Sequence, residues 1–113
     1  MSLRDKVLAR KTKEETLELD GDKFLVVGKT KRERAALFAK SRKKDQSIDF
    51  ERLENVILSE CVLDPETKAK LLEPAEWDGV VSELTGPLVA ACMRLLGMDK
   101  TDLSPKDSDS TET

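Results

Sequence analysis

The sequence has no histidine and no tyrosine, and its aromatic residues are one tryptophan and three phenylalanines. Histidine is the most frequent general base and a frequent metal ligand, so its absence argues against acid–base catalysis and most zinc sites. So few aromatic rings also argue against a stacking platform for single-stranded nucleic acid. The five glycines are scattered and form no phosphate loop, and neither C-x-x-C nor G-x-S-x-G occurs. We therefore expect no enzymatic activity and no cofactor.

Cysteine is scarce, and long apolar runs are missing. Cys61 and Cys92 both lie among apolar residues in predicted helices. Two interpretations are open, a disulfide or two buried free thiols, and the apolar surroundings favour free thiols. No apolar run reaches the ~20 residues that cross a bilayer, and no signal peptide opens the chain. We therefore expect a protein of a reducing, cytoplasmic compartment without membrane contact.

Charge is unevenly distributed along the chain, although the net charge is only −3. Residues 1–44 carry 14 basic and 7 acidic side chains, residues 45–97 carry 4 and 11, and residues 98–113 carry 2 and 5. The three blocks therefore have net charges of +7, −7 and −3. Opposite blocks attract each other within one fold or between neighbouring copies. The pattern predicts a homo-oligomer whose copies stack head to tail.

The N-terminal part of the chain is predicted to contain an arm, a hairpin and a helix. Residues 1–14 form a flexible basic arm, whose thin apolar pattern also fits a short helix formed against a partner. Residues 17–27 are typical of two short strands joined by Asp20-Gly21, a strong hairpin signal. Thr30 and Glu33 fit a capping box at the start of the following helix.

A helix at the centre of the fold is predicted between Asp49, which can cap its start, and Pro65, which forbids its continuation. Its apolar residues form two stripes rather than one, which indicates an element covered from two sides. Residues 61–66 are then predicted to form a corner between two helices, because Asp64 can cap a new helix with Pro65 at its first position.

The rest of the chain is predicted to be helical up to residue 97. A short helix over residues 65–73 is followed by one that begins at Pro74 and ends at Gly86-Pro87. Residues 88–96 form an almost entirely apolar helix, and Gly97 is its C-cap.

The predicted fold class is mainly α. We expect one small helical domain over residues 15–97 with an N-terminal β-hairpin. Residues 98–113 are polar and acidic, so they cannot bury enough apolar surface to offset their ordering entropy. They are predicted to be a disordered acidic C-terminal tail.

Two sets of residues are candidates for contacts with a partner. The two-striped central helix and the helix over residues 88–96 offer more apolar surface than one small core requires. Trp77 is either an interface anchor or ordinary core. The predicted apolar binding residues are Leu58, Val62, Trp77, Leu88, Val89, Met93 and Leu96. The predicted charge-mediated contacts are made by Arg32, Arg34, Arg42, Lys43 and Lys44.

Glu60 and the basic stretch over residues 29–44 leave alternatives open. Glu60 lies either at the edge of the apolar face or buried against Arg94. The basic stretch favours contacts with an acidic protein or, as an alternative function, a small helical nucleic-acid-binding regulator. The balance of 18 basic and 18 acidic residues over 1–97 argues against nucleic acid as the partner.

The order of these features resembles a family of bacteriophage proteins. The hairpin is followed by V-G-K-T-K-R-E-R-A-A-L-F-A, and the central helix leaves through S-E-C-V-L-D-P-E. Then come E-P-A-E-W-D-G-V-V-S-E-L-T-G-P-L-V and L-L-G-M. Over residues 15–97 the arrangement resembles the tail assembly chaperones of long-tailed, lambda-like siphoviruses. In that family a strand pair leads into a mainly helical body with a "V-x-D-P"-like corner and a segment ending in "L-T/S-G".

The resemblance implies a non-enzymatic role in tail assembly. Such chaperones bind the tape measure protein, a very long helical chain, and recruit tail tube subunits to polymerise around it in the host cytoplasm. They are absent from the mature virion, and in many of these phages a ribosomal frameshift adds a tube-binding extension. The tape measure protein and the tail tube protein are therefore the expected partners.

Overall fold

The computed structural model describes residues 2–98, and its N-terminal sheet begins with the predicted hairpin. Strands β1 (Glu14–Leu19) and β2 (Asp22–Val27) pair antiparallel, with Leu19 opposite Asp22. The two residues between them, Asp20 and Gly21, both have positive φ, at 51° and 84°. Two positive φ angles are what a two-residue type I′ turn requires, and Asp-Gly tolerates them. The hairpin prediction is confirmed.

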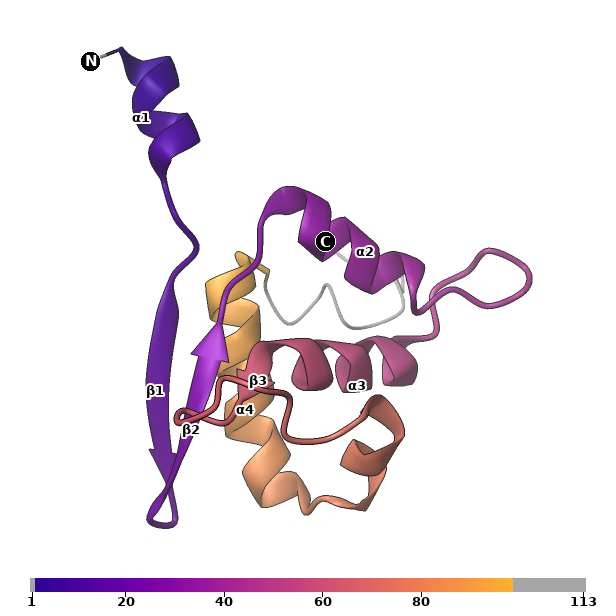
Figure 1. The fold of residues 1–113 in the computed structure, drawn as a ribbon. Coiled ribbons are helices and arrows are strands. Elements are labelled where there is room, and N and C mark those ends of the chain that lie inside the picture. The colour runs from indigo at the N-terminus through magenta and orange to yellow at the C-terminus, as the bar shows by residue number, and fades with distance from the viewer. Residues whose placement is uncertain (1, 99–113) are drawn as a thin grey trace, which may run out of the picture.

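A third strand extends the hairpin. Strand β3 (Val62–Leu63) pairs antiparallel with β2, placing Val62 opposite Val26 and Leu63 opposite Leu25. The sheet order is therefore β1-β2-β3, and β1 forms an outer edge (Figure 1). A hairpin alone is marginal in water, and here a third strand and a helix support it. Helix α4 (Ser82–Leu96) packs against both β1 and β2.

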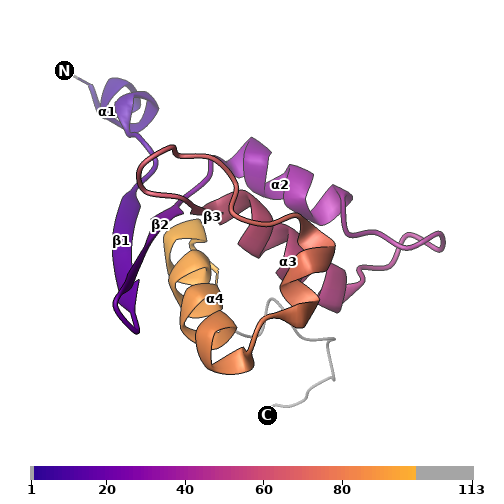
Figure 2. The same ribbon diagram turned by 60° about the horizontal axis from the view of Figure 1, so that its bottom comes forward.

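Helix α3 (Phe50–Cys61) occupies the centre of the body, as predicted. Asp49 caps it, because its side chain accepts a hydrogen bond from the N–H of Arg52 at 3.1 Å. It contacts α4, strands β2 and β3, helix α2 (Lys31–Ala39) and the 3₁₀ helix η1 (Pro74–Gly79) (Figures 1 and 2). The two apolar stripes of α3 are therefore covered from two sides by elements of its own chain.

The corner predicted after α3 is wrong. The chain leaves the helix as strand β3, and residues 65–73 form turns rather than a short helix. The Asp64 carboxylate accepts hydrogen bonds from the N–H groups of Glu66 at 2.8 Å and Thr67 at 3.4 Å, which closes a local turn. Lys68 has φ of 61°, which a continuous helix does not allow. Pairing with β2 and this turn together outweigh the helix-start signal of Asp64-Pro65.

The predicted helix break at Gly86-Pro87 is also wrong, because α4 runs through both residues. Pro87 is the sixth residue of the helix, so its missing N–H removes one hydrogen bond near the N-terminal end. Gly86 has no Cβ to clash with the proline ring, which relieves the usual restriction before proline. At the other end Gly97 adopts φ of 74°, and the Met98 N–H bonds the Met93 carbonyl at 2.8 Å, as a C-cap glycine predicts.

The capping box before α2 is confirmed. The Thr30 hydroxyl accepts from the Glu33 N–H at 3.2 Å, and the Glu33 carboxylate accepts from the Thr30 N–H at 2.9 Å. About half of the described residues are helical, and the sheet holds three strands, so the helical content is lower than a mainly helical fold suggests. Met98 is buried and belongs to the body, whereas the rest of the tail predicted over residues 98–113 lies outside the described residues.

The N-terminal arm contains a helix, which was one of the two interpretations left open for it. Residues Leu3–Ala9 form helix α1, capped by the Ser2 hydroxyl, which accepts from the Asp5 N–H at 3.2 Å. No residue of α1 is buried, and the helix stands apart from the body beyond the start of β1 (Figures 1 and 2). The open alternative, a short helix available to a partner, matches the structure better than the arm without secondary structure.

Candidate protein-binding surfaces

Most of the apolar residues predicted to bind a partner lie in the core of the protein. Six of the seven are at most 6% exposed, and Val89 is partly buried against the same cluster. They therefore form no exposed surface in this conformation, and their contact with a partner stays a prediction. Each packs where α3, α4, η1 and the sheet meet, so the folded chain itself covers them. The buried six are Leu58, Val62, Trp77, Leu88, Met93 and Leu96.

Trp77 belongs to η1 and is core rather than an exposed anchor. It is 4% exposed and lies in the cluster that contains α3 and α4. Its indole N–H has no hydrogen-bond partner among the described residues. An unpartnered buried donor costs about 1–3 kcal/mol, which the burial of a large ring offsets.

The five cations predicted to make charge-mediated contacts divide into two groups. Arg34 Nη1 donates to the Leu96 carbonyl at 3.4 Å, and Arg42 Nη1 donates to the Gln46 carbonyl at 3.0 Å. The Arg34 bond links α2 to the end of α4, whereas the Arg42 bond spans only its own loop. The remaining three, Arg32, Lys43 and Lys44, are exposed and form no ion pair with any residue between 2 and 98. Four of the five, Arg32, Arg42, Lys43 and Lys44, are exposed, so their contacts with a partner stay a prediction.

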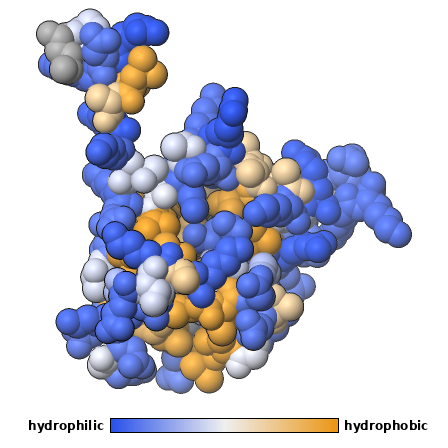
Figure 3. Space-filling view, in the orientation of Figure 1, coloured by the Kyte–Doolittle hydropathy of each residue, from blue (hydrophilic) through white to orange (hydrophobic). Residues whose placement is uncertain are grey.

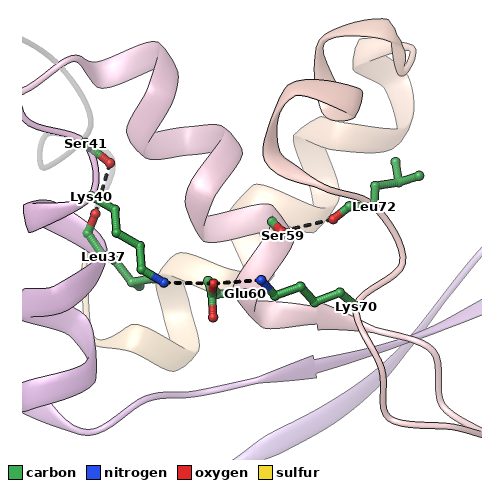
Figure 4. A network of polar contacts seen from close by, with 7 residues as sticks. All are labelled: Leu37, Lys40, Ser41, Ser59, Glu60, Lys70 and Leu72. Atoms are coloured by element: carbon green, nitrogen blue, oxygen red, sulfur yellow. Dashed lines mark hydrogen bonds and ion pairs between the residues drawn. The ribbon is translucent and has the colours of Figure 1, made fainter.

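Glu60 lies at the edge of the apolar face of α3, which was one of the two alternatives. Its Oε2 lies 3.1 Å from Nζ of Lys40 and 3.1 Å from Nζ of Lys70, as Figure 4 shows. Arg94 does not approach it and instead pairs with Glu15 of β1. Partial burial by itself raises the pKa of Glu60, but the hydrogen bonds from Lys70 and Lys40 outweigh it and hold that pKa below its usual value.

Two buried serines make further polar contacts near Glu60. The Ser59 hydroxyl donates to the Leu72 carbonyl at 2.9 Å, and the Ser41 hydroxyl donates to the Leu37 carbonyl at 3.0 Å (Figure 4). Both serines are fully buried, so these bonds satisfy groups that would otherwise be costly. Ser59 and Glu60 tie α3 to the end of α2 and to the loop that follows β3, whereas the Ser41 bond closes the C-terminal end of α2.

Replacing Glu60 with glutamine should lower the free energy of unfolding by about 0.5–1 kcal/mol at pH 7. The variant keeps the shape of the side chain but loses the charge that holds both lysines. Because the folded pKa is depressed, the contribution of the carboxylate is present at neutral pH and is lost as pH falls through the folded pKa. Urea unfolding at pH 7 and in acid should show a difference from wild type that is largest at pH 7 and shrinks as the pH falls through the folded pKa.

Glu54, an exposed residue of the same helix without an ion pair in residues 2–98, supplies the matched control. Glu54→Gln should leave stability almost unchanged at both pH values. An equal loss in the two variants, or a loss that persists in acid, would show that the lysine contacts do not stabilise the fold.

The two cysteines are free and buried, as predicted. Cys61 of α3 and Cys92 of α4 are both fully buried. The neighbouring Cys61 thiol and burial raise the pKa of Cys92 far above its usual range, so its thiol stays protonated at neutral pH. The pair acts as two small apolar side chains where the helices cross.

Large apolar side chains that do face solvent are concentrated in the arm. Leu3, Val7 and Leu8 of α1 are 77%, 58% and 68% exposed, and Figure 3 shows apolar atoms gathered on one side of this helix. On the body, Leu71 and Val81 are exposed. A helix formed against a partner was one of the two interpretations of this apolar pattern. The binding residues predicted from the sequence did not, however, include Leu3, Val7 or Leu8.

A hollow of about 560 Å³ lies between the turn end of β2 and the loop after β3. We call it the hairpin hollow. Its apolar lining consists of Phe24, Pro65 and Leu71, and its charged lining consists of Asp22, Asp64 and Glu66 with a single lysine, Lys23. Sequence analysis missed this site, because it forms only when β3 brings residues 64–71 beside β2.

A second hollow, of about 370 Å³, lies between the start of α3 and η1. It is mainly polar, and its lining includes Asp49, Glu51 and Arg52. Asn55 Nδ2 donates to Asp78 Oδ1 at 2.8 Å across its floor, which fixes η1 against α3. With no exposed large apolar side chain in its lining, it offers less to a protein partner than the hairpin hollow.

Two further findings concern residues 2–98 alone. No group of three or more cysteine or acidic residues is arranged there to hold a metal ion. None of the helices in that part of the chain has the length and apolar character to cross a bilayer. Comparison with known proteins found no family model, no curated protein and no solved structure that matches this chain.

Proposed function

We propose that this protein is a tail assembly chaperone of a long-tailed bacteriophage. In this role it binds the tape measure protein in the host cytoplasm, helps to recruit tail tube subunits, and does not remain in the mature virion. The proposal rests on the resemblance over residues 15–97 and on the surfaces that the fold leaves exposed.

The observation that carries the proposal is the separation of the molecule into a closed body and an apolar arm. The body buries most of its large apolar residues and exposes only Leu71 and Val81 among those described, whereas α1 presents Leu3, Val7 and Leu8 to solvent. A seven-residue helix is marginal in water unless its apolar side packs against something. Exposed apolar surface on a tethered helix is typical of a site that meets another chain.

The charge distribution supports the same function. Residues 2–13 carry five basic side chains and one acidic side chain, a net charge of +4, while the hairpin hollow is acidic. A protein with complementary charged and apolar surfaces at its two ends can assemble as repeated copies along an extended partner. Repeated copies are what a very long helical chain needs in order to stay covered until the tube forms around it.

The decisive experiment begins with the gene immediately downstream, which should encode a very long, predominantly helical chain. Co-expression of that chain with this protein should increase its soluble fraction several-fold and yield a complex that survives gel filtration. An unrelated helical protein of similar length serves as the control and should gain no solubility. Equal aggregation of the long chain with and without this protein would overturn the proposal.

A further inference from the structure

We propose that helix α1 of one copy binds the hairpin hollow of a second copy, so that copies of this chain join head to tail. The inference concerns this chain alone and does not require the tape measure protein. It assigns a binding site to the exposed arm and a ligand to the hollow.

The arm offers the chemistry of a docking peptide. Leu3 and Val7 are four residues apart and therefore lie on one side of α1, with Leu8 beside them. All three are more than half exposed. Basic side chains surround them on the helix and its linker, namely Arg4, Lys6, Arg10, Lys11 and Lys13. The arm therefore requires an apolar site with an acidic rim.

The hairpin hollow meets that requirement. Phe24 and Leu71 provide apolar lining, and Leu71 is one of only two large apolar side chains exposed on the described body. Three carboxylates against one lysine give the lining a net charge of −2. The arm has a net charge of +4, so the two surfaces are complementary in sign as well as in apolar character.

The geometry favours a neighbouring copy over the molecule's own hollow. Residues 10–13 link α1 to β1, and the five Cα–Cα steps from Ala9 to Glu14 span at most ~18 Å when extended. The hollow lies at the turn end of the hairpin, whereas α1 projects beyond the opposite end, at Glu14 (Figure 1). From Glu14 to Leu19, which pairs with Asp22, takes five strand steps or ~17 Å, and the hollow lies farther across β2. The arm would therefore have to reverse direction along β1 with its linker almost fully extended to reach its own hollow.

Arm and hollow are different surfaces, so their contact is heterologous and leaves one of each unoccupied on every dimer. Copies can therefore continue to add. A seven-residue helix buries a small area, which makes each contact weak and reversible on its own. A long partner would strengthen it by holding many copies side by side.

Sedimentation velocity of the full chain tests the proposal. Between about 10 µM and about 1 mM at low salt, the mean sedimentation coefficient should rise continuously with concentration. Raising the salt to about 0.5 M should reduce the association several-fold, because the contact depends on opposite charges. A chain that stays monomeric throughout at low salt, including one whose arm folds back onto its own hollow, overturns the proposal.

Two variants separate the arm from the hollow. The first variant, Leu3→Asp with Val7→Asp, removes the apolar side of the arm. The second, Asp22→Lys with Glu66→Lys, changes the net charge of the hollow lining from −2 to +2. All four side chains are exposed, so both variants should fold, and circular dichroism checks this. Each variant alone should be monomeric, whereas Val81→Asp, at an exposed valine of another surface, should associate like wild type.

Mixing the two variants provides the decisive test. The mixture retains one intact hollow on the arm-defective chain and one intact arm on the hollow-defective chain, so it should form 1:1 dimers and nothing larger. Persistent association of either variant alone overturns the proposal. Failure of the mixture to dimerise also overturns it, because that result indicates arm-to-arm packing or another interface.

Discussion

Replacing Gly28 with alanine is expected to lower the free energy of unfolding by about 2 kcal/mol, because the added methyl group has no space. A Cβ at this position would lie 2.9 Å from the Leu95 carbonyl oxygen and 3.3 Å from the Lys13 carbonyl oxygen. Both are backbone atoms and cannot rotate away. Gly28 also donates its N–H to Lys13 at 2.7 Å, so the strand cannot move without losing that bond. The helix α4 and the hairpin must therefore separate slightly.

Gly79→Ala provides the matched control, since a Cβ there meets nothing within 4 Å. Urea unfolding followed by tryptophan fluorescence should show a lower midpoint for Gly28→Ala and little change for Gly79→Ala. Equal stability of Gly28→Ala and wild type would mean that α4 packs less closely against the hairpin than the structure shows.

Replacing Leu88 with alanine should have the largest effect, a loss of about 3 kcal/mol of unfolding free energy. Leu88 is fully buried in α4 within the cluster that also holds α3 and the sheet. Its truncation removes apolar burial and leaves a cavity that a rigid core fills only in part. Chemical denaturation should detect the loss as a shift of the midpoint without a large change of slope.

This substitution also separates the core role of Leu88 from the partner-binding role predicted for it. If Leu88 acts only in the core, the folded fraction of Leu88→Ala should associate as wild type does. Val81→Ala, at a residue that is 64% exposed near the start of α4, should change stability by less than about 0.5 kcal/mol. Loss of association without loss of stability in Leu88→Ala would restore the original interpretation.

Local signals in the sequence predicted much of the fold. Asp20-Gly21, the Thr30–Glu33 capping box, Asp49 and Gly97 each act through the backbone of their own neighbourhood, so they predict turns and helix ends correctly. The ion pairs of Glu60 could not be predicted from such local signals. Its partners lie 20 and 10 residues away and are set by how α2 and the loop after β3 pack.

The failures share one cause, which is that tertiary contacts override local preference. Pro65 indicated a new helix, but pairing of Val62 with β2 drew the chain into the sheet. Pro87 indicated a helix end, but α4 continues because its buried side chains pack against α3 and the sheet. One lost hydrogen bond is a smaller term than the burial of several large side chains.

The candidate binding sites were harder to predict from the sequence than the fold. Apolar periodicity indicates that Leu58 or Met93 is covered, but it does not indicate whether the cover is the same chain or a partner. The structure shows that their own chain covers them. The opposite holds for α1, where a weak apolar pattern is fully exposed, and for the hairpin hollow, whose residues are 40 or more positions apart in the sequence.

The side chains at the outer edge of β1 affect whether copies can aggregate by pairing these edges. Its Glu14, Thr16 and Glu18 are exposed, while the alternate residues face the body. Antiparallel docking of two such edges centred on Thr16 would bring Glu14 of each copy opposite Glu18 of the other, which like charges oppose. The bare backbone of this strand is therefore shielded from fibril-like stacking as long as its carboxylates are ionised. Ordered assembly would then depend on side-chain contacts, which are weak and reversible, rather than on backbone pairing between edges.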